Sequence, residues 1–326
     1  MQEKKELKKD VNRVSLGVII YTLLMYGSMF VYMFVALGYE AAKNAASLDE
    51  FSRNMDIVLE GDFFEKQIEV SGVPYFIAIG IGILFLLIYS WRSLDKKRMF
   101  QQEQRMTAKR FGMLLCVFMG VQLPFSIVDI VIEKGLNRFG YTAMEGVEMA
   151  SAESVTLSMF LYASFLGPVA EELIYRGFVM KSLEKHGKIL ALVVSSILFG
   201  VMHGNLTQSM FAIFVGLVLG YVAMEYSLKW SILLHIINNC LFGEIMSKCM
   251  KGLSESTQEI ISYGIMGAFF VGACVILWRK RCAIRNYIQT HSVEKRKYLY
   301  AFTSVCFLIF VIAAAVEGFL VITPMK

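Results

Sequence analysis

Two adjacent glutamates, Glu171 and Glu172, lie inside an apolar stretch that reads GPVAEELIYRGF over residues 167–178. A charge in the hydrocarbon of a bilayer costs roughly 2.5–3.5 kcal/mol even on the insertion scales that assign the lowest penalty. Glu172 and Arg176 are four positions apart, so they should meet on one helix face and neutralise each other. Glu171 points about 100° away and lacks such a partner. The unpaired acid therefore suits proton transfer, and the paired acid suits a structural role.

Two of the four histidines also lie in apolar stretches. His203 lies in the run SSILFGVMHGN, one helical turn after Phe199. His235 lies in WSILLHIINNC, where Asn239 follows four positions later and Asn238 lies beside it. A lone histidine between membrane helices is most often a hydrogen-bonding group, and an E-x-x-x-R pair alone is usually a structural salt bridge. Because lone polar groups are penalised in lipid, their combination predicts that three helices bring them together around a hydrated cavity.

Long apolar runs surround these residues. The chain has 326 residues, of which 56% are hydrophobic and 18% charged. A helix needs about 20 residues to cross a bilayer, and backbone groups in lipid must bond within the segment itself. We therefore predict an all-α, polytopic transmembrane bundle of about eight or nine membrane-spanning helices. The predicted spans are residues 15–37, 73–91, 111–132, 154–178, 189–204, 209–226, 229–247, 260–278 and 299–322.

Basic residues cluster in alternate connecting segments. The segments 1–13, 92–110 and 279–297 are rich in lysine and arginine, whereas segment 39–72 has eight acidic residues and only three basic ones. By the positive-inside rule the basic segments and the N-terminus are cytoplasmic. The net charge of +5 then reflects membrane topology and gives no reason to expect a nucleic-acid partner. We expect the acidic segment to lie outside, partly as an amphipathic helix on the membrane surface.

The pattern predicts one membrane domain over residues 1–326, with core helices in 154–247 and peripheral transmembrane helices in 1–150 and 255–326. The six cysteines form no C-x-x-C pair and indicate no metal or disulfide framework. The first apolar run exceeds the h-region of a signal peptide, so we expect it to be a retained helix. No organellar transit segment is recognisable, which favours a multi-pass protein of a plasma membrane, of bacterial type.

The polar motifs resemble those of a known family. EELIYR, FGVMH and HIINN occur in the order EExxxR, FxxxH and HxxxN, and between the two histidine motifs lies FVGLVLG, with Gly216 and Gly220. This pattern resembles the CAAX-prenyl-protease and bacteriocin-processing (CPBP, or Abi) family of intramembrane proteases. The similarity covers roughly residues 154–247, and the outer spans carry no recognisable family signal.

The resemblance implies an endopeptidase that hydrolyses a peptide bond in a membrane-associated or lipidated peptide or protein. Carried over, Glu171 is the general base that activates water, and His203 helps to hold that water. His235 and Asn239 would stabilise the oxyanion. The supporting residues would be Glu172, Arg176, Phe199 and Asn238.

The resemblance leaves two chemistries open. A zinc ion held by Glu171, His203 and His235 would keep a position for water. However, the sequence contains no H-E-x-x-H motif, and asparagine is a poor zinc ligand and a good oxyanion donor, which slightly favours metal-free hydrolysis by Glu171. The expected partners are membrane lipids and a peptide substrate. Anionic headgroups are a better match than a substrate carboxylate for the cytoplasmic basic residues Arg176, Lys181, Lys185 and Lys188.

Two other functions remain open. The first is a non-catalytic immunity or scaffold protein on the same fold. The second is a proton-coupled transporter that uses Glu171 and Glu172 as relays, although no inverted repeat supports it. For a protease, bacteriocin processing, self-immunity and peptide-signal maturation are the candidate roles.

The predicted spans place the site residues at unequal depths. If the span 154–178 ends at residue 178, Glu171 lies ~10 Å from its cytoplasmic end, whereas His203 lies ~22 Å along the next span. Residues of one site should be level. Either the span that carries Glu171 ends later, or the next span starts in the cytoplasm and the turn GNLTQ stops below the outer surface.

Overall fold

The computed structural model describes residues 2–91, 96–143 and 154–325, and within these ranges the chain is almost entirely helical. Two short strands of the described part, β1 (Tyr141–Thr142) and β2 (Thr323–Pro324), pair antiparallel. The predicted all-α bundle is therefore confirmed, and the strands only join the segment after the helical stretch Ala108–Asn137 to the segment near residue 324.

The elements follow one another with few long connections. The N-terminal part contains α1 (Gln2–Ala42), α2 (Leu48–Glu60), α3 (Phe63–Glu65), η1 (Lys66–Val70), α4 (Val73–Tyr89) and α5 (Lys96–Met99). Next come α6 (Ala108–Gly120), α7 (Gln122–Asn137), α9 (Leu157–Leu161), η2 (Tyr162–Leu166), α10 (Gly167–Glu172), η3 (Leu173–Met180), α11 (Lys181–Leu183) and η4 (Glu184–His186). The remaining helices are α12 (Lys188–Val201), α13 (Leu206–Glu225), α14 (Leu228–Ile236), η5 (Ile237–Ile245), α15 (Met246–Met250), α16 (Glu255–His291), α17 (Lys295–Phe302) and α18 (Val305–Leu320).

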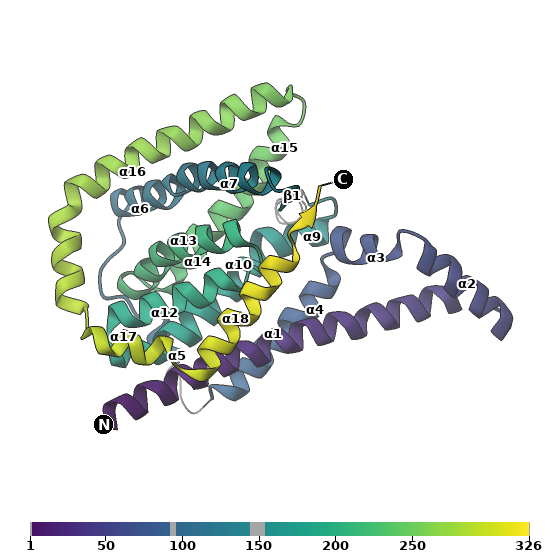
Figure 1. The fold of residues 1–326 in the computed structure, drawn as a ribbon, viewed down its shortest axis with the longest axis horizontal. Coiled ribbons are helices and arrows are strands. Elements are labelled where there is room, and N and C mark those ends of the chain that lie inside the picture. The colour runs from purple at the N-terminus through teal and green to yellow at the C-terminus, as the bar shows by residue number, and fades with distance from the viewer. Residues whose placement is uncertain (1, 92–95, 144–153, 326) are drawn as a thin grey trace.

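The helices that carry the polar motifs lie at the centre of the bundle. α12 packs against α13, and α13 packs against α14. α1 and α4 run along one side of this centre, whereas α16 lies over α6 and α7 on another side (Figure 1). The outer helices therefore enclose α10, α12 and α14.

Five helical stretches of the described residues are long and apolar enough to cross a membrane: Gln2–Ala42, Ala108–Asn137, Leu157–His186, Leu206–Glu225 and Glu255–His291. A sixth is obtained if α17 and α18, which meet at a bend of 65°, count as one span. α4 and α12, with 17 and 14 residues, are apolar but shorter than the length that a full crossing needs. The chain is thus a multi-pass membrane protein, and the predicted count of eight or nine spans is not confirmed.

Close helix approach depends on glycine at two positions. A Cβ atom added to Gly200 in α12 would lie 2.2 Å from Cγ1 of Ile213 and 2.6 Å from the carbonyl oxygen of Ser209 in α13. A Cβ atom added to Gly120 would lie 2.5 Å from Cβ of Ala273 in α16. Small residues at such contacts let membrane helices pack backbone against backbone.

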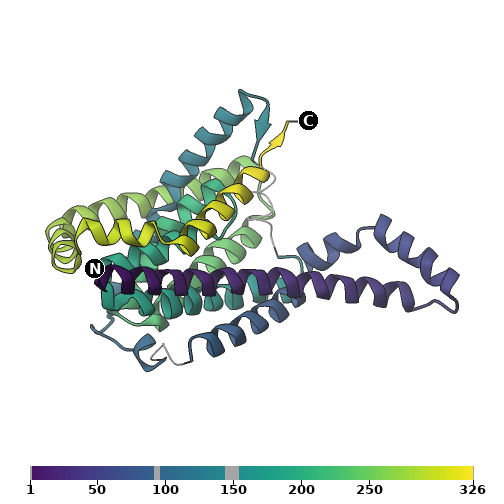
Figure 2. The same ribbon diagram turned by 60° about the horizontal axis from the view of Figure 1, so that its bottom comes forward.

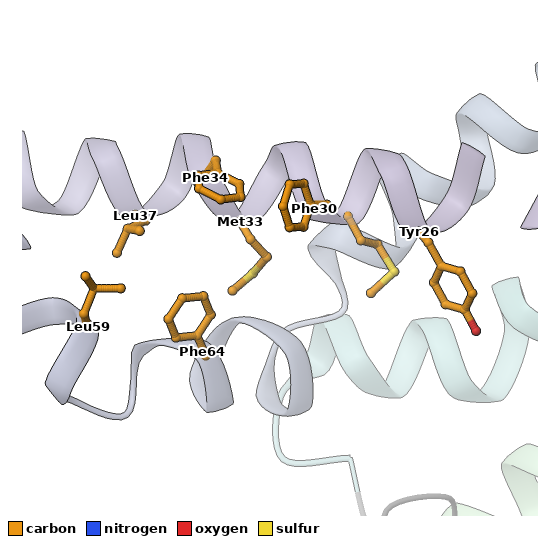
Figure 3. A pocket seen from close by; sticks show the side chains of 8 residues that line it. Tyr26, Phe30, Met33, Phe34, Leu37, Leu59 and Phe64 are labelled. Atoms are coloured by element: carbon orange, nitrogen blue, oxygen red, sulfur yellow. The ribbon is translucent and has the colours of Figure 1, made fainter. Parts of the chain in front are cut away.

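The end of α1 and the helix α2 project away from the bundle, as both views show (Figures 1 and 2). The amphipathic helix expected within residues 39–72 is found as α2, which has no buried residue. A cavity of about 480 Å³ lies between α1 and the segment α2–α3, and Figure 3 shows its apolar side chains. Its lining residues are Tyr26, Met29, Phe30, Met33, Phe34, Leu37, Leu59 and Phe64.

Candidate active site

Proline distorts the helix that carries the two glutamates. The N–H group of Gly167 donates to the carbonyl oxygen of Tyr162, one residue further back than in an α-helix, and this defines the π-helical segment η2. Pro168 has no N–H group and cannot donate to the carbonyl of Ala163 in the same register. The carbonyl oxygen of Ala163 is therefore left without a backbone donor, just before Glu171.

Glu172 is fully buried and accepts from three side chains. Its Oε1 atom lies 2.7 Å from Nη1 of Arg176 and 3.1 Å from Nδ1 of His235. Its Oε2 atom accepts from the hydroxyl of Ser231. The predicted pairing of Glu172 with Arg176 is confirmed. A carboxylate with three such partners is held in place and compensated, so it has little freedom to act as a base.

Arg176 is also fully buried, with its guanidinium held from two further sides. Nη2 donates to the carbonyl oxygen of Gly216 in α13 at 3.3 Å. The guanidinium carbon lies 4.1 Å from the centroid of the Phe199 ring in α12, a cation–π contact. A side chain at residue 216 would come within 3.3 Å of Nη2, so glycine leaves the space that the arginine occupies. Arg176 thereby joins η3, α12 and α13, and its burial shows that the expectation of a lipid headgroup at Arg176 is wrong.

Glu171 contacts the other edge of the same imidazole. Its Oε2 atom lies 3.6 Å from Nε2 of His235, while Nδ1 of that ring faces Glu172. The Glu171 side chain is 24% exposed, against 0% for Glu172. At 3.6 Å the two atoms do not form a direct hydrogen bond, and one water molecule beside them can contact both. The neighbouring acids are therefore distinct: Glu172 is enclosed, and Glu171 is partly exposed.

His203 lies at the turn that follows α12. Its Nδ1 atom is 2.9 Å from the carbonyl oxygen of Phe199. Because a carbonyl can only accept, Nδ1 carries the proton and Nε2 remains available. The Phe199 ring contacts both imidazoles, with ring centroids 5.1 Å from His203 and 6.0 Å from His235, and is perpendicular to both. Within the described ranges no hydrogen bond or ion pair joins His203 to Glu171, although the two are close enough to interact electrostatically.

The side chain of Asn239 is held by hydrogen bonds to Ala163 and Asn238, and none of its bonds in the described part of the chain goes to an imidazole. Its Nδ2 atom donates to the carbonyl oxygen of Ala163 at 3.2 Å, and its Oδ1 atom accepts from Nδ2 of Asn238 at 2.9 Å. The helix becomes π-helical directly after Ile236, between His235 and Asn239. Asn239 thus satisfies the carbonyl that Pro168 leaves without a donor, with one further N–H group to spare.

The depth mismatch of the predicted spans is resolved by the true end of the fourth one. The helix continues to His186, past the predicted end at residue 178, because residues after 178 remain helical through α11 and η4. Glu171 lies 15 positions before His186, and His203 lies 15 positions after Lys188, which starts α12. Both are then about 22 Å from the turn at Gly187, at roughly 1.5 Å per residue. The two residues are level, on adjacent helices.

Sequence reasoning missed two side chains of this region. Ser231 lies one turn before His235 and is fully buried against Glu172. Gln122, at the start of α7, donates to Oδ1 of Asn238 at 3.0 Å. The i, i+4 spacing to His235 was a usable signal for Ser231. Nothing in the sequence indicates the contact of Gln122, which is 116 positions from its partner.

Three tyrosines also lie near Glu171. Tyr21 of α1, Tyr162 of η2 and Tyr175 of η3 are all close enough to interact electrostatically with its carboxylate. The hydroxyl of Tyr175 is buried and has no hydrogen-bond partner in the described part of the chain. Through Tyr21, α1 also contributes to the surroundings of Glu171.

Both imidazoles are oriented as metal-bound histidines often are, with Nδ1 on an oxygen and Nε2 free. However, within the ranges 2–91, 96–143 and 154–325 no three His, Cys, Asp or Glu side chains lie together as a metal site. The predicted zinc ligands Glu171, His203 and His235 therefore remain a prediction.

The central segment of the chain matches a model of a known protein family. The family model described as "Type II CAAX prenyl endopeptidase Rce1-like" matches residues 153–241. This match covers the glutamate pair, both histidine motifs and the glycine-spaced helix, and it confirms the resemblance to the CPBP family over that part of the chain. No curated protein and no solved structure matches the chain. The matched family is described as an endopeptidase, and the match extends over the segment that carries the polar motifs and not over the outer helices.

Proposed function

We propose that this chain is an intramembrane endopeptidase in which Glu171 activates a water molecule for attack on a peptide bond. The observation that carries the proposal is the different surroundings of the two adjacent glutamates. Glu172 is enclosed by Arg176, Ser231 and His235, whereas Glu171 is partly exposed and lies 3.6 Å from Nε2 of His235. A base must be free to accept a proton, and only Glu171 meets that requirement.

The hydrolytic step follows from this placement. Glu171 takes a proton from water, and the hydroxide oxygen forms a bond to the carbonyl carbon of the substrate. When the C–N bond then breaks, the proton held by Glu171 passes to the leaving nitrogen. A positioned base of this kind contributes about 10²–10⁴-fold to the rate.

The other residues are proposed to act on the water and on the oxyanion. His203, with its Nδ1 proton fixed on the Phe199 carbonyl, offers Nε2 as an acceptor for a proton of the attacking water. Asn239 is proposed as a donor for the oxyanion of the tetrahedral intermediate. His235 is proposed as a second donor in its doubly protonated form, in which Nδ1–H stays on Glu172 and Nε2–H faces the oxyanion. Loss of one preorganised donor typically costs about 2.7–4 kcal/mol in transition-state stabilisation.

The substrate is proposed to be a peptide or lipidated protein that already lies in the membrane. The residues near Glu171 are deep in the bundle, about 22 Å from the turn at Gly187 by helical rise. A segment that is already in the bilayer reaches this depth without transferring an apolar chain through water. Bacteriocin processing, self-immunity and peptide-signal maturation in a bacterial plasma membrane are the candidate roles.

The proposal is tested with purified protein in lipid vesicles and a quenched fluorescent peptide library. Wild type should cleave members of the library, and Glu171→Ala should lose cleavage while inserting normally. Glu259→Ala, at an exposed glutamate near the start of α16, is the matched control and should cleave like wild type. An immunity scaffold would show no cleavage in any variant, and a proton carrier would lose proton flux with Glu171→Ala. Either result would overturn the proposal.

A further inference from the structure

A chain of three amide side chains connects α7 to the site. Nε2 of Gln122 donates to Oδ1 of Asn238 at 3.0 Å, Nδ2 of Asn238 donates to Oδ1 of Asn239 at 2.9 Å, and Nδ2 of Asn239 donates to the Ala163 carbonyl at 3.2 Å. Gln122 lies outside the family match, which begins at residue 153. These hydrogen bonds therefore connect the site to Gln122, a residue that the family motifs do not include.

One end of this series of amides is fixed by the carbonyl of Ala163. The carbonyl of Ala163 lacks a backbone donor because Gly167 donates to Tyr162 and Pro168 has no N–H group. A buried carbonyl without a partner costs free energy comparable to a lost hydrogen bond. Asn239 removes that cost only if its NH₂ group, and not its oxygen, faces the backbone of η2.

The three hydrogen-bonded amides also share one donor-to-acceptor direction. Each amide accepts through its oxygen and donates through its NH₂ group, and an NH₂ group has two N–H bonds. Gln122 supplies the first donor, so the oxygen of Asn238 is occupied and its NH₂ group faces Asn239. Because the oxygen of Asn239 is occupied in turn, its second N–H group is left as a donor that no hydrogen bond within the described ranges uses.

We propose that Gln122 is a positioning residue, which fixes the amide of Asn239 so that its second N–H group serves the oxyanion. This inference rests on the proposed protease function and adds α7 to the site. The Ala163 carbonyl sets the orientation of the three amides at one end, and Gln122 restrains the other end. Without the donor at residue 122, the oxygen of Asn238 loses its bond to α7, so the amides of Asn238 and Asn239 are held less firmly in position.

The experiment uses Gln122→Met, which keeps the length of the side chain and removes its donor. We measure kcat and KM in vesicles with the best-cleaved member of the quenched fluorescent library. Misplacement of a group in the transition state lowers rates on the order of 10–100-fold, and we expect that fall in kcat with little change in KM. Ser126→Ala, one turn later on α7, is the control and should leave both constants unchanged, since its hydroxyl bonds to the backbone carbonyl of Gln122, not to the side-chain amide, and to the sulfur of Met266.

A double-mutant cycle separates positioning from a general effect on packing. If Gln122 acts through Asn239, then Gln122→Met has no further effect on kcat once Asn239→Ala is present. Asn238→Leu breaks the same chain one link later and should show the same pattern, which provides a second variant if Gln122→Met folds poorly. Effects that multiply in the cycle, or an unchanged kcat in Gln122→Met, would overturn the inference. Full cleavage by Asn239→Ala and Glu171→Ala would instead overturn the proposed function itself.

Discussion

Replacement of Arg176 by methionine should strongly destabilise the protein. Arg176 and Glu172 are both 0% exposed, and Nη1 lies 2.7 Å from Oε1. The substitution also removes the hydrogen bond to the carbonyl of Gly216 and the contact with the ring of Phe199. It leaves the carboxylate of Glu172 buried with Ser231 and His235 as its remaining partners.

The magnitude follows from the buried charge. Breaking a buried ion pair by removing one partner typically costs about 3–5 kcal/mol, because the other charge stays without compensation. Ser231 still donates to Glu172, so we expect a value near the lower end of that range, roughly 3 kcal/mol. The double variant Glu172→Gln/Arg176→Met removes both charges, and its loss should fall short of the sum of the single losses by about 1–3 kcal/mol.

The assay is unfolding in mixed micelles of mild detergent and dodecyl sulfate, followed by tryptophan fluorescence. Asp62 and Lys66 provide a matched control, because they have the same i, i+4 spacing and the same 2.7 Å distance but are exposed. Lys66 donates to Asp62, which lowers the pKa of that carboxyl, yet solvent screens the pair and Lys66→Met should have little effect on unfolding. The reasoning is refuted if Arg176→Met destabilises the protein no more than Lys66→Met does.

Three further outcomes are expected. Ser231→Ala leaves Oε2 of Glu172 without its donor and should destabilise the protein by about 1–3 kcal/mol in the same unfolding assay; wild-type stability would contradict the contact. Gly200→Ala places a methyl group 2.6 Å from the carbonyl oxygen of Ser209, and overpacking of this kind typically costs about 1–3 kcal/mol; an unchanged midpoint would show that α12 and α13 separate easily. Chelation of metals should leave peptide cleavage unchanged if hydrolysis is metal-free, and loss of activity with recovery on adding zinc would instead support the zinc ligands predicted from the sequence.

Local spacing predicted what lies on one helix. Glu172 and Arg176 are one turn apart, and no other element is needed to bring them together. The apolar runs likewise predicted where helices occur, because helices are the only open structures that satisfy their backbone in lipid. α1 nevertheless begins well before its apolar run, since the lysines and glutamates that precede the run are good helix formers.

The remaining features depend on contacts between distant segments. The span predicted for residues 154–178 ends at His186, because its polar last turns stay helical against the bundle. The span predicted for 299–322 is bent by 65° near Ser304, between α17 and α18. Pro168 suggested a bend in the sequence, but its consequence, a π-helical turn that frees the Ala163 carbonyl, becomes visible only with Asn239 in place. Tertiary hydrogen bonds of this kind carry no periodic signal.

The most direct test of the account compares the membrane peptides of cells that carry wild-type protein with those of cells that carry Glu171→Ala. Glu259→Ala serves again as the control. The account predicts that one or more membrane-associated peptides appear cleaved with wild type and Glu259→Ala, and remain intact with Glu171→Ala at equal protein levels in the membrane. Identical peptide profiles for all three, with equal expression, would contradict the claim that Glu171 activates water for peptide hydrolysis.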